Sequence, residues 1–167
     1  MKEISCHSFS KHVAWSTIVA GAWALSFALY FEIFQDYEAC HLCLLQRIPY
    51  IIMIIIGALG VLRPQFILFC ITLTLVTTVA STLLALYHVG VEQNLWDSIS
   101  ACKSTAIGHI SVEELKKSLL ERPALSCANI EWSVFGISMA GYNSLYSLFL
   151  AFMSVLVLRK LKEENIG

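Results

Sequence analysis

Charged residues are scarce in this sequence, and so are the residues that interrupt helices. Among 167 residues there are 11 Lys or Arg, 12 Asp or Glu, 3 prolines and 8 glycines. An ordinary soluble domain carries about 25% charged residues. A chain that is 14% charged and 57% hydrophobic is therefore not of that class. The net charge of −1 provides no basic surface, so we expect no nucleic-acid partner.

Four long apolar segments account for this composition: Val13–Phe34, Leu44–Leu62, Phe66–Tyr87 and Val134–Leu158. Their lengths of 19 to 25 residues suit helices that cross a bilayer core of about 30 Å. The first segment is longer than the apolar region of a signal peptide, so we interpret it as an uncleaved span. The sequence predicts one domain over residues 1–167, an all-α integral membrane protein with a four-transmembrane-helix bundle.

Four spans place both termini and the Arg63-Pro64 turn on one side of the membrane. The loops over residues 35–43 and 88–133 then lie on the other side. The side with the termini has six basic residues and the loop side has five, a small excess that favours cytoplasmic termini.

A pair of cysteines, Cys40 and Cys43, stands at the start of the second span, and Arg47 follows. In a helix Cys43 and Arg47 lie one turn apart on one face, where the guanidinium favours the thiolate. An arginine at the edge of hydrocarbon is costly, which makes Arg47 a candidate functional residue. The alternative is an arginine that merely reaches the lipid headgroups.

The long loop carries two more cysteines, so the loop side has an even set of four: Cys40, Cys43, Cys102 and Cys127. Such a set is typical of a disulfide-permissive compartment and allows three pairings. The simplest is a local Cys40–Cys43 bridge with a loop-closing Cys102–Cys127 bridge. A bridge across so short a loop as Cys40–Cys43 removes little chain entropy, which favours exchange chemistry over stapling. Of the other two cysteines, Cys6 is interpreted as a reduced thiol without a function and Cys70 as a buried apolar residue.

His88 closes the third span on the side of the cysteine pair. It is a candidate neighbour of that pair, and the alternative is an ordinary interfacial residue. Cys40, Cys43 and His88 lack a fourth metal ligand unless Cys102 or Cys127 joins them, so we expect no metal site.

The long loop also contains a predicted short helix. Ser111 and Glu114 form a capping box, and the apolar residues that follow share one face: Val112, Leu115, Leu119 and Leu120. This amphipathic helix is too short to span a bilayer. It lies either on the membrane surface or against the bundle.

These features together resemble the bacterial disulfide bond formation protein B family (DsbB). The resemblance covers nearly the whole chain. It is carried by Cys-x-Leu-Cys-x-x-x-Arg at the second span, Tyr87-His88-x-Gly90 closing the third, the loop cysteine pair, and Trp132 before the fourth.

The resemblance implies a quinone reductase of the bacterial inner membrane that reoxidises the periplasmic thiol oxidase DsbA, with cysteine loops in the periplasm. DsbA would attack Cys102 of a Cys102–Cys127 bridge, and electrons would pass to Cys40–Cys43. Cys43 would deliver them to a bound ubiquinone or menaquinone, with Arg47 and His88 beside it. In the family the amphipathic loop segment associates with the membrane surface.

One residue departs from the family pattern. Gln46 stands before the arginine, where some members carry an acid, so proton handling near the quinone is expected to differ. Two other functions stay open: a paralogue that serves a dedicated DsbA-like partner, and a non-catalytic membrane scaffold with stapled loops.

Overall fold

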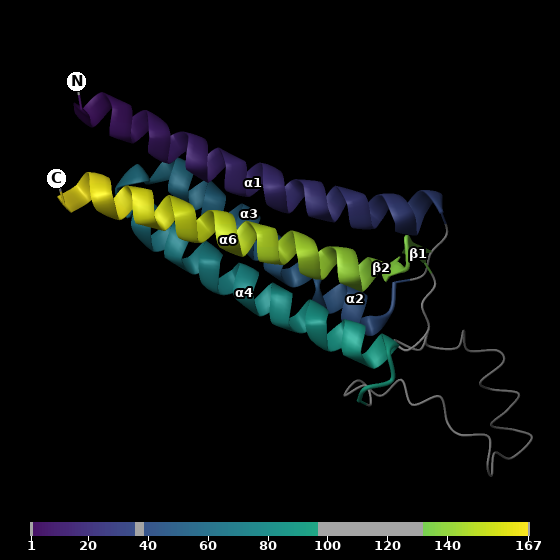
Figure 1. Ribbon diagram of the computed structural model, residues 1–167. Helices are drawn as coiled ribbons and strands as arrows, with labels where there is room; N and C mark the ends of the chain where they lie inside the picture. Colours follow the sequence, from purple (N-terminus) through teal and green to yellow (C-terminus); the bar gives the residue numbers. More distant parts are fainter. Residues whose placement is uncertain (1, 36–38, 97–131, 167) are drawn as a thin grey trace, which may run out of the picture.

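The computed structural model describes residues 2–35, 39–96 and 132–166. Its main elements are four long helices, α1 (Lys2–Phe34), α3 (Arg47–Leu62), α4 (Ile67–Glu92) and α6 (Met139–Ile166) (Figure 1). Shorter elements precede three of them: the helix α2 (His41–Leu45), the 3-10 helix η1 (Pro64–Phe66), and the strands β1 (Ser133–Val134) and β2 (Ile137–Ser138). The two strands pair antiparallel, with Ser133 opposite Ser138.

The predicted fold class is confirmed. In the described part of the chain, four helical segments are long and apolar enough to cross a membrane: Phe9–Phe34, His41–Leu62, Pro64–Glu92 and Met139–Glu163. The predicted amphipathic helix near Ser111 lies outside the described residues.

Several helix boundaries differ from the sequence prediction, and two of them shape the cysteine end of the bundle. The last long helix begins at Met139 and not at Val134, because Phe135 and Gly136 have φ values of 51° and 76° and form the turn between β1 and β2. Helical backbone requires negative φ, so the helix begins only after this turn. The third span continues through Glu92, beyond the predicted end at Tyr87. This extension holds His88 and Glu92 on one rigid helix.

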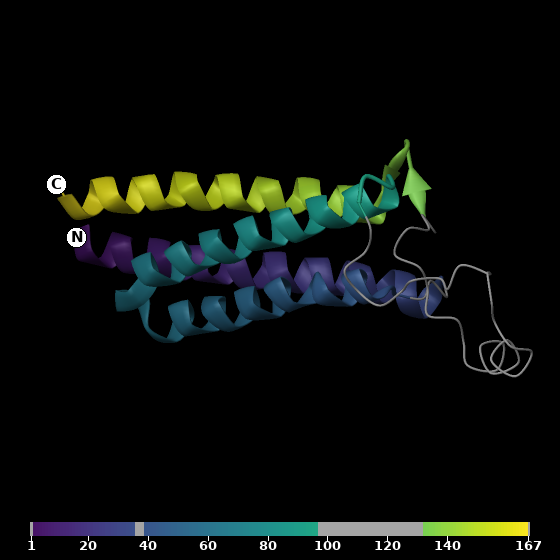
Figure 2. The ribbon, with the colours of Figure 1, turned by 90° about the horizontal axis from the view of Figure 1, so that it is seen from below.

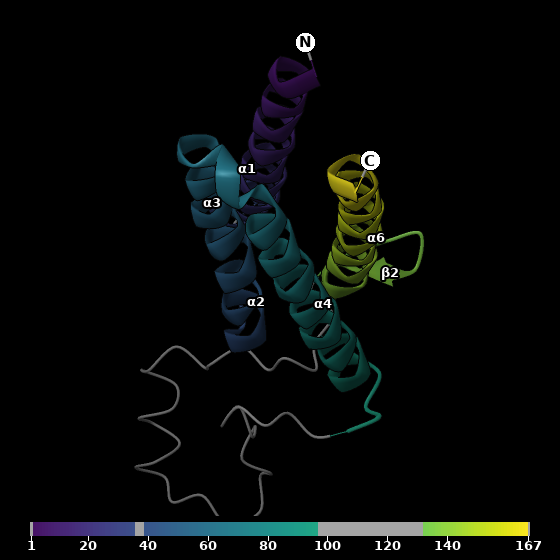
Figure 3. The ribbon, with the colours of Figure 1, turned by 90° about the vertical axis from the view of Figure 1, so that its left-hand side faces the viewer.

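The helices lie side by side, with both termini at one end of the bundle and α2, β1 and β2 at the other (Figures 1 and 2). α1 packs along α3, α4 packs along α6, and α3 also contacts α4. The end view shows the four helices around a common axis (Figure 3). The cysteine pair before and within α2 is therefore at the end opposite the termini.

The distribution of side chains suits a lipid environment. Large apolar side chains point outward, with Trp23 68% exposed and Phe69 67% exposed. Small hydroxyl residues are buried between the helices, among them Thr74, Thr78 and Ser147. The Thr74 and Thr78 hydroxyls donate to backbone carbonyls one turn earlier, at 2.9 and 3.0 Å. Polar groups satisfied inside a helix bundle, with apolar groups outside, are the arrangement that hydrocarbon requires.

Two glycines allow α1 and α3 to approach closely. A Cβ at Gly21 would lie 2.9 Å from the Tyr50 carbonyl oxygen. A Cβ at Gly57 would lie 2.6 Å from Ile18 and 3.0 Å from the Ala14 carbonyl oxygen. These contacts are with backbone as well as side chains, so larger residues would separate the two helices.

Candidate active site

The cysteine pair is positioned by the start of α2. Cys40 is the N-cap of this helix, in an extended conformation, and its sulfur accepts a hydrogen bond from the Cys43 backbone N–H at 3.3 Å. The Cys40 thiol in turn donates to the Cys43 sulfur, with 3.0 Å between the two sulfur atoms. The two thiols therefore face each other, as a pair that alternates between dithiol and disulfide must.

The two sulfurs differ in environment. The hydrogen bond to Cys43 and burial together raise the pKa of the Cys40 thiol to about 12, while contact with His88 acts in the opposite direction. Cys40 thus keeps its proton and offers it to the Cys43 sulfur. A donated hydrogen bond stabilises negative charge on its acceptor, which makes Cys43 the sulfur suited to carry the thiolate.

His88, which the sequence offered as a candidate neighbour with an interfacial residue as the alternative, lies beside the pair. Its side chain is buried, and Nε2 is 3.6 Å from the Cys40 sulfur. On the other side of the ring, Nδ1 is 2.8 Å from the Gln46 side-chain nitrogen. The imidazole is therefore held between the thiols and a buried amide.

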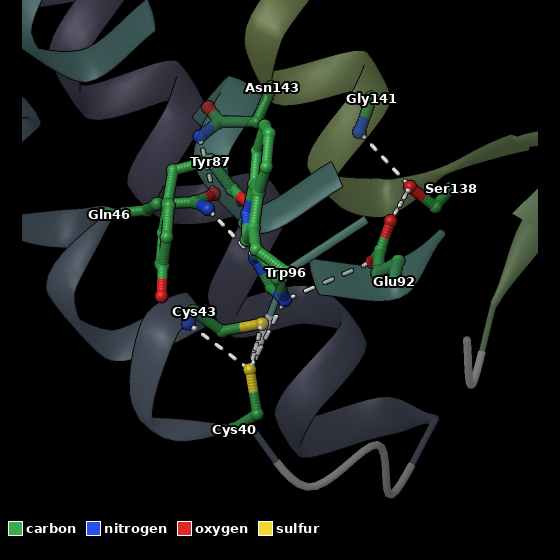
Figure 4. A network of polar contacts seen from close by, with 10 residues as sticks. Cys40, Cys43, Gln46, Tyr87, Glu92, Trp96, Ser138, Gly141 and Asn143 are labelled. Atoms are coloured by element: carbon green, nitrogen blue, oxygen red, sulfur yellow. Dashed lines mark hydrogen bonds and ion pairs between the residues drawn. The ribbon is translucent and has the colours of Figure 1, made fainter. Parts of the chain in front are cut away.

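A chain of polar side chains continues from Gln46 into the bundle (Figure 4). Asn143 of α6 donates to the Gln46 oxygen at 2.6 Å, and the Tyr50 hydroxyl contacts the Asn143 oxygen. Tyr50 is also 3.0 Å from the Ser147 hydroxyl, which is 3.0 Å from Ser81. These hydrogen-bonded side chains join α3, α4 and α6. They were not predicted from the sequence, because they lie far apart along the polypeptide.

Gln46 occupies the junction between α2 and α3. Pro49 lacks a backbone N–H and is tolerated in the first turn of a helix, so α3 begins at Arg47 with Pro49 as its third residue. The predicted span Leu44–Leu62 therefore contains a break between α2 and α3. The break turns Gln46 inward, where its side chain is buried.

Arg47 pairs with a residue that sequence reasoning missed. Its Nη2 is 2.6 Å from Oε2 of Glu32, in the last turn of α1, and the two side chains are 20% and 37% exposed. The Arg47 Nε atom is buried and has no hydrogen-bond partner among the described residues. A buried donor without a partner is costly, so this N–H is a point where a ligand oxygen would be stabilised.

A cavity of about 310 Å³ lies beside these groups. Cys40, Cys43, Arg47 and His88 contribute to its polar wall. Its apolar wall includes aromatic rings and the small residues of α1: Trp23, Phe31, Trp132, Tyr142, Ala24 and Ala28. The small side chains of Ala24 and Ala28 on α1 leave room for the cavity. Pockets of this kind, apolar with a few convergent polar groups, are typical of small-molecule sites.

A second polar branch leaves His88 on the opposite side from Gln46. Its Nε2 is 3.9 Å from Oε1 of Glu92, one turn further along α4, and both side chains are almost fully buried. The Ser138 hydroxyl donates to the other Glu92 oxygen and accepts from the Gly141 backbone N–H at 3.2 Å. The i, i+4 spacing of His88 and Glu92 was the available sequence signal for this pair.

Gly90 of the Tyr87-His88-x-Gly90 motif provides room for Trp96. A Cβ at position 90 would lie 2.0 Å from the indole ring. Trp96 stacks on Tyr87 and donates its N–H to the Tyr87 carbonyl oxygen at 2.9 Å. The glycine therefore allows the chain to fold back over the end of α4.

Of the remaining cysteines, Cys70 is the one whose side chain the structure describes, and it does not line the cavity. Cys70 is buried in α4, where it faces Gly60: a Cβ at Gly60 would lie 3.8 Å from the Cβ of Cys70. Cys102 and Cys127 lie outside the described residues. Ligand atoms of Cys40, Cys43 and His88 lie within 4.8 Å of one another, one ligand short of a tetrahedral zinc site.

Comparison with known proteins shows the family to which the chain belongs. The family model for disulfide bond formation protein DsbB matches residues 10–157. An uncharacterized protein of Rickettsia prowazekii is 30% identical over 137 residues, which cover 81% of this chain and 80% of that protein. The disulfide bond formation protein B of Xylella fastidiosa is 27% identical, covering 80% of each chain, and that of Histophilus somni is 23% identical, covering 93% of each. Since the family model spans most of its length, the chain belongs to the DsbB family, whose members are membrane proteins of disulfide bond formation.

Proposed function

We propose that this protein is a membrane thiol oxidase that reoxidises a periplasmic DsbA-type oxidoreductase and passes the electrons to a membrane quinone. Two cysteine pairs would carry the electrons, first Cys102–Cys127 and then Cys40–Cys43. The observation that carries the proposal is the position of the Cys40–Cys43 pair on the wall of a cavity that also contains Arg47.

The cavity is suited to a quinone ring. Its walls are largely aromatic and apolar, and the buried Arg47 Nε–H has no protein partner in the described part of the chain. Arg47 would hold a carbonyl oxygen through this N–H, while its pairing with Glu32 fixes the guanidinium. A bound quinone supplies an acceptor for two electrons and two protons.

The cysteines have distinct roles in this proposal. Cys43 would carry the thiolate that faces the cavity, stabilised by the thiol of Cys40. Closure of the Cys40–Cys43 disulfide would release two protons and pass two electrons to the acceptor, and exchange with the loop cysteines would reduce the pair again. DsbA has a potential of about −120 mV, so its reoxidation requires an acceptor stronger than an ordinary dithiol pool.

The same proposal sets the orientation. The protein would lie in the bacterial inner membrane, with both termini cytoplasmic and the cysteine end facing the periplasm. The location of both termini at the end of the bundle opposite α2 is compatible with this orientation.

The direct test is anaerobic mixing of the purified protein with reduced DsbA and a soluble ubiquinone or menaquinone analogue, following quinone absorbance. We expect quinone consumption that Cys40→Ser abolishes and Cys70→Ser leaves unchanged, since Cys70 does not line the cavity. Absence of consumption with both analogues would reject the proposal and favour the scaffold alternative. Consumption with a dedicated DsbA-like reductant alone would indicate the paralogue function.

A further inference from the structure

The buried carboxylate of Glu92 has no role in the function proposed above. It lies on α4 one turn beyond His88, and its side chain is 6% exposed. A charge this deeply buried is costly unless it is paired and hydrogen-bonded. Its partners are the Ser138 hydroxyl and His88 Nε2. The same Nε2 atom is 3.6 Å from the Cys40 sulfur, so the carboxylate, the imidazole and the thiol form one connected group.

We propose that Glu92 is a positioning residue that enables His88 to accept the proton of the Cys40 thiol. When the proton moves, the S–H bond of Cys40 breaks and an N–H bond forms at His88 Nε2. The resulting imidazolium is a buried cation, and Glu92 is the anion 3.9 Å away that compensates it. Cys40 is left as the thiolate that forms the bond to the Cys43 sulfur while the pair gives up two electrons.

The Gln46 side of the ring is compatible with this proton transfer. The row of hydrogen bonds that begins at this side of the ring runs through four side chains: Gln46, Asn143, Tyr50 and Ser147. Each side chain contains both a donor and an acceptor, so all the hydrogen bonds in the row can form with either orientation of donors and acceptors. In one direction the Gln46 nitrogen donates to Nδ1. In the other, the Gln46 oxygen accepts from Nδ1–H, and the lone pair of Nε2 faces the Cys40 thiol. The protonated ring then has a partner at both nitrogens.

Cys40 needs such a base. The hydrogen bond to Cys43 and burial raise the pKa of the Cys40 thiol, so it holds its proton at neutral pH unless a base accepts it. Oxidation of the pair forms the Cys40–Cys43 bond, removes two electrons and releases two protons. The two electrons go to the acceptor proposed above, and the Cys40 proton passes first to His88. The inference rests on the proposed function only in taking Cys40–Cys43 as a working redox pair.

Other ionisable groups line the same cavity, and a pH profile has to be interpreted with them in view: Glu32, Cys43, Arg47, Tyr50, Tyr142 and Tyr146. Glu92 differs from these groups because its carboxylate is within reach of His88 Nε2. Glu92→Gln keeps the shape of the side chain and an oxygen for the Ser138 hydroxyl, removes the charge, and replaces the acceptor that faces His88 with an amide donor.

The test needs no quinone. In the full-length chain with Cys6, Cys70, Cys102 and Cys127 replaced by Ser, the reduced protein is mixed with dithiodipyridine. Attack by Cys43 forms a mixed disulfide and releases one thiopyridone. Attack by Cys40 on the Cys43 sulfur then forms the Cys40–Cys43 bond, and the second thiopyridone leaves with the electron pair and a proton.

We expect Glu92→Gln to slow the second release about 10- to 100-fold at pH 7, with the first release unchanged. The deficit should shrink as the pH rises, because hydroxide then ionises Cys40 without an internal base. Glu92→Asp should recover most of the rate. Glu163→Gln, the same change at an exposed position near the end of α6, is the matched control and should leave both releases unchanged.

An unchanged second release in Glu92→Gln, or a deficit that does not shrink with pH, would overturn the inference. Circular dichroism checks that the variant is helical, and Glu92→Asp decides the matter if Glu92→Gln is not folded. Failure of the proposed function would appear separately, as wild-type protein that closes its disulfide with dithiodipyridine but consumes no quinone.

Discussion

At the scale of single residues, the nitrogens of the Arg47 guanidinium lie in two different environments. Its Nη2 end is neutralised by Glu32, and its buried Nε–H has no partner in the described part of the chain. An arginine that only reached for headgroups would leave no buried donor beside a cavity. The pairing with Glu32 also reduces the cost of keeping the charge at the edge of hydrocarbon.

Replacing Arg47 by Gln should therefore weaken quinone binding and spare thiol exchange. A hydrogen bond from a charged donor contributes about 1.5–3 kcal/mol, so we expect the KM for the quinone analogue to rise at least about tenfold. Exchange of the cysteine pairs with reduced DsbA should keep its rate in a quinone-free mixture. Arg63→Gln, at an exposed position at the other end of α3, is the control. An unchanged KM would remove Arg47 from the quinone site.

The raised pKa of Cys40 gives a prediction about pH. Because the thiolate of Cys40 is favoured only above a pH of about 12, its reaction with iodoacetamide should be negligible at pH 7 and should rise about tenfold per pH unit. Cys43 should be the sulfur that is modified near neutral pH. Mass spectrometry of the reduced protein, alkylated briefly at a series of pH values, measures both.

Preferential modification of Cys40 at neutral pH would contradict this assignment of the two thiols. Cys40→Ser supplies the control for the peptide assignment, because only Cys43 of the pair is then available.

The sequence identified the cysteine pair, Arg47 and His88, but not their partners. The pair and the arginine are close in the sequence, so their spacing is informative. Gln46 meets Asn143 across 97 residues, and Ser138 meets Glu92 across 46. Such contacts depend on the rotation of each helix about its axis, which hydrophobic length alone does not determine.

At the scale of the helices, small residues control how closely α1 and α3 pack. Gly57 lies against Ile18 and the backbone of Ala14 on α1. The sequence predicted both helices from their apolar length. It did not indicate that Gly57 makes the contact, because nearly every position in these spans is apolar. The start of α6 was missed for a similar reason. The apolar run continues through Val134 and Phe135, but Phe135 and Gly136 have positive φ values and form a turn.

Gly57→Val should destabilise the bundle. A Cβ at this position would lie 3.0 Å from a backbone oxygen that cannot easily move, so the helices must separate. Overpacking of this kind costs about 1–3 kcal/mol. The thermal unfolding temperature in detergent, followed by circular dichroism, should fall. Ala58→Val adds bulk on the neighbouring, exposed residue of the same helix and should leave the unfolding temperature unchanged. Equal unfolding temperatures for the two variants would show that α1 and α3 do not meet at Gly57.

At the scale of the whole molecule, the bundle separates two ends with different contents. The termini lie at one end, while α2, with the cysteine pair at its start, and the β1–β2 turn lie at the other (Figure 1). The cavity is at the second end, because Glu32, Arg47 and His88 all lie near the ends of their helices there. A protein that accepts electrons from a soluble partner and delivers them within the bilayer needs its thiols at this boundary. The count of basic residues alone gave only a weak preference for which end faces the cytoplasm.

The orientation is testable by labelling single-cysteine variants with a membrane-impermeant maleimide. One variant keeps Cys43, which lines the cavity at the cysteine end, and the other keeps Cys6, in α1 near the N-terminus. If the cysteine end faces the periplasm, reduced Cys43 should react in intact spheroplasts and Cys6 only in inverted vesicles. Detergent-solubilised samples provide the control that each thiol is reactive. The reverse pattern would place the cysteine pair in the cytoplasm, where disulfides are rare, and would exclude oxidation of a periplasmic partner.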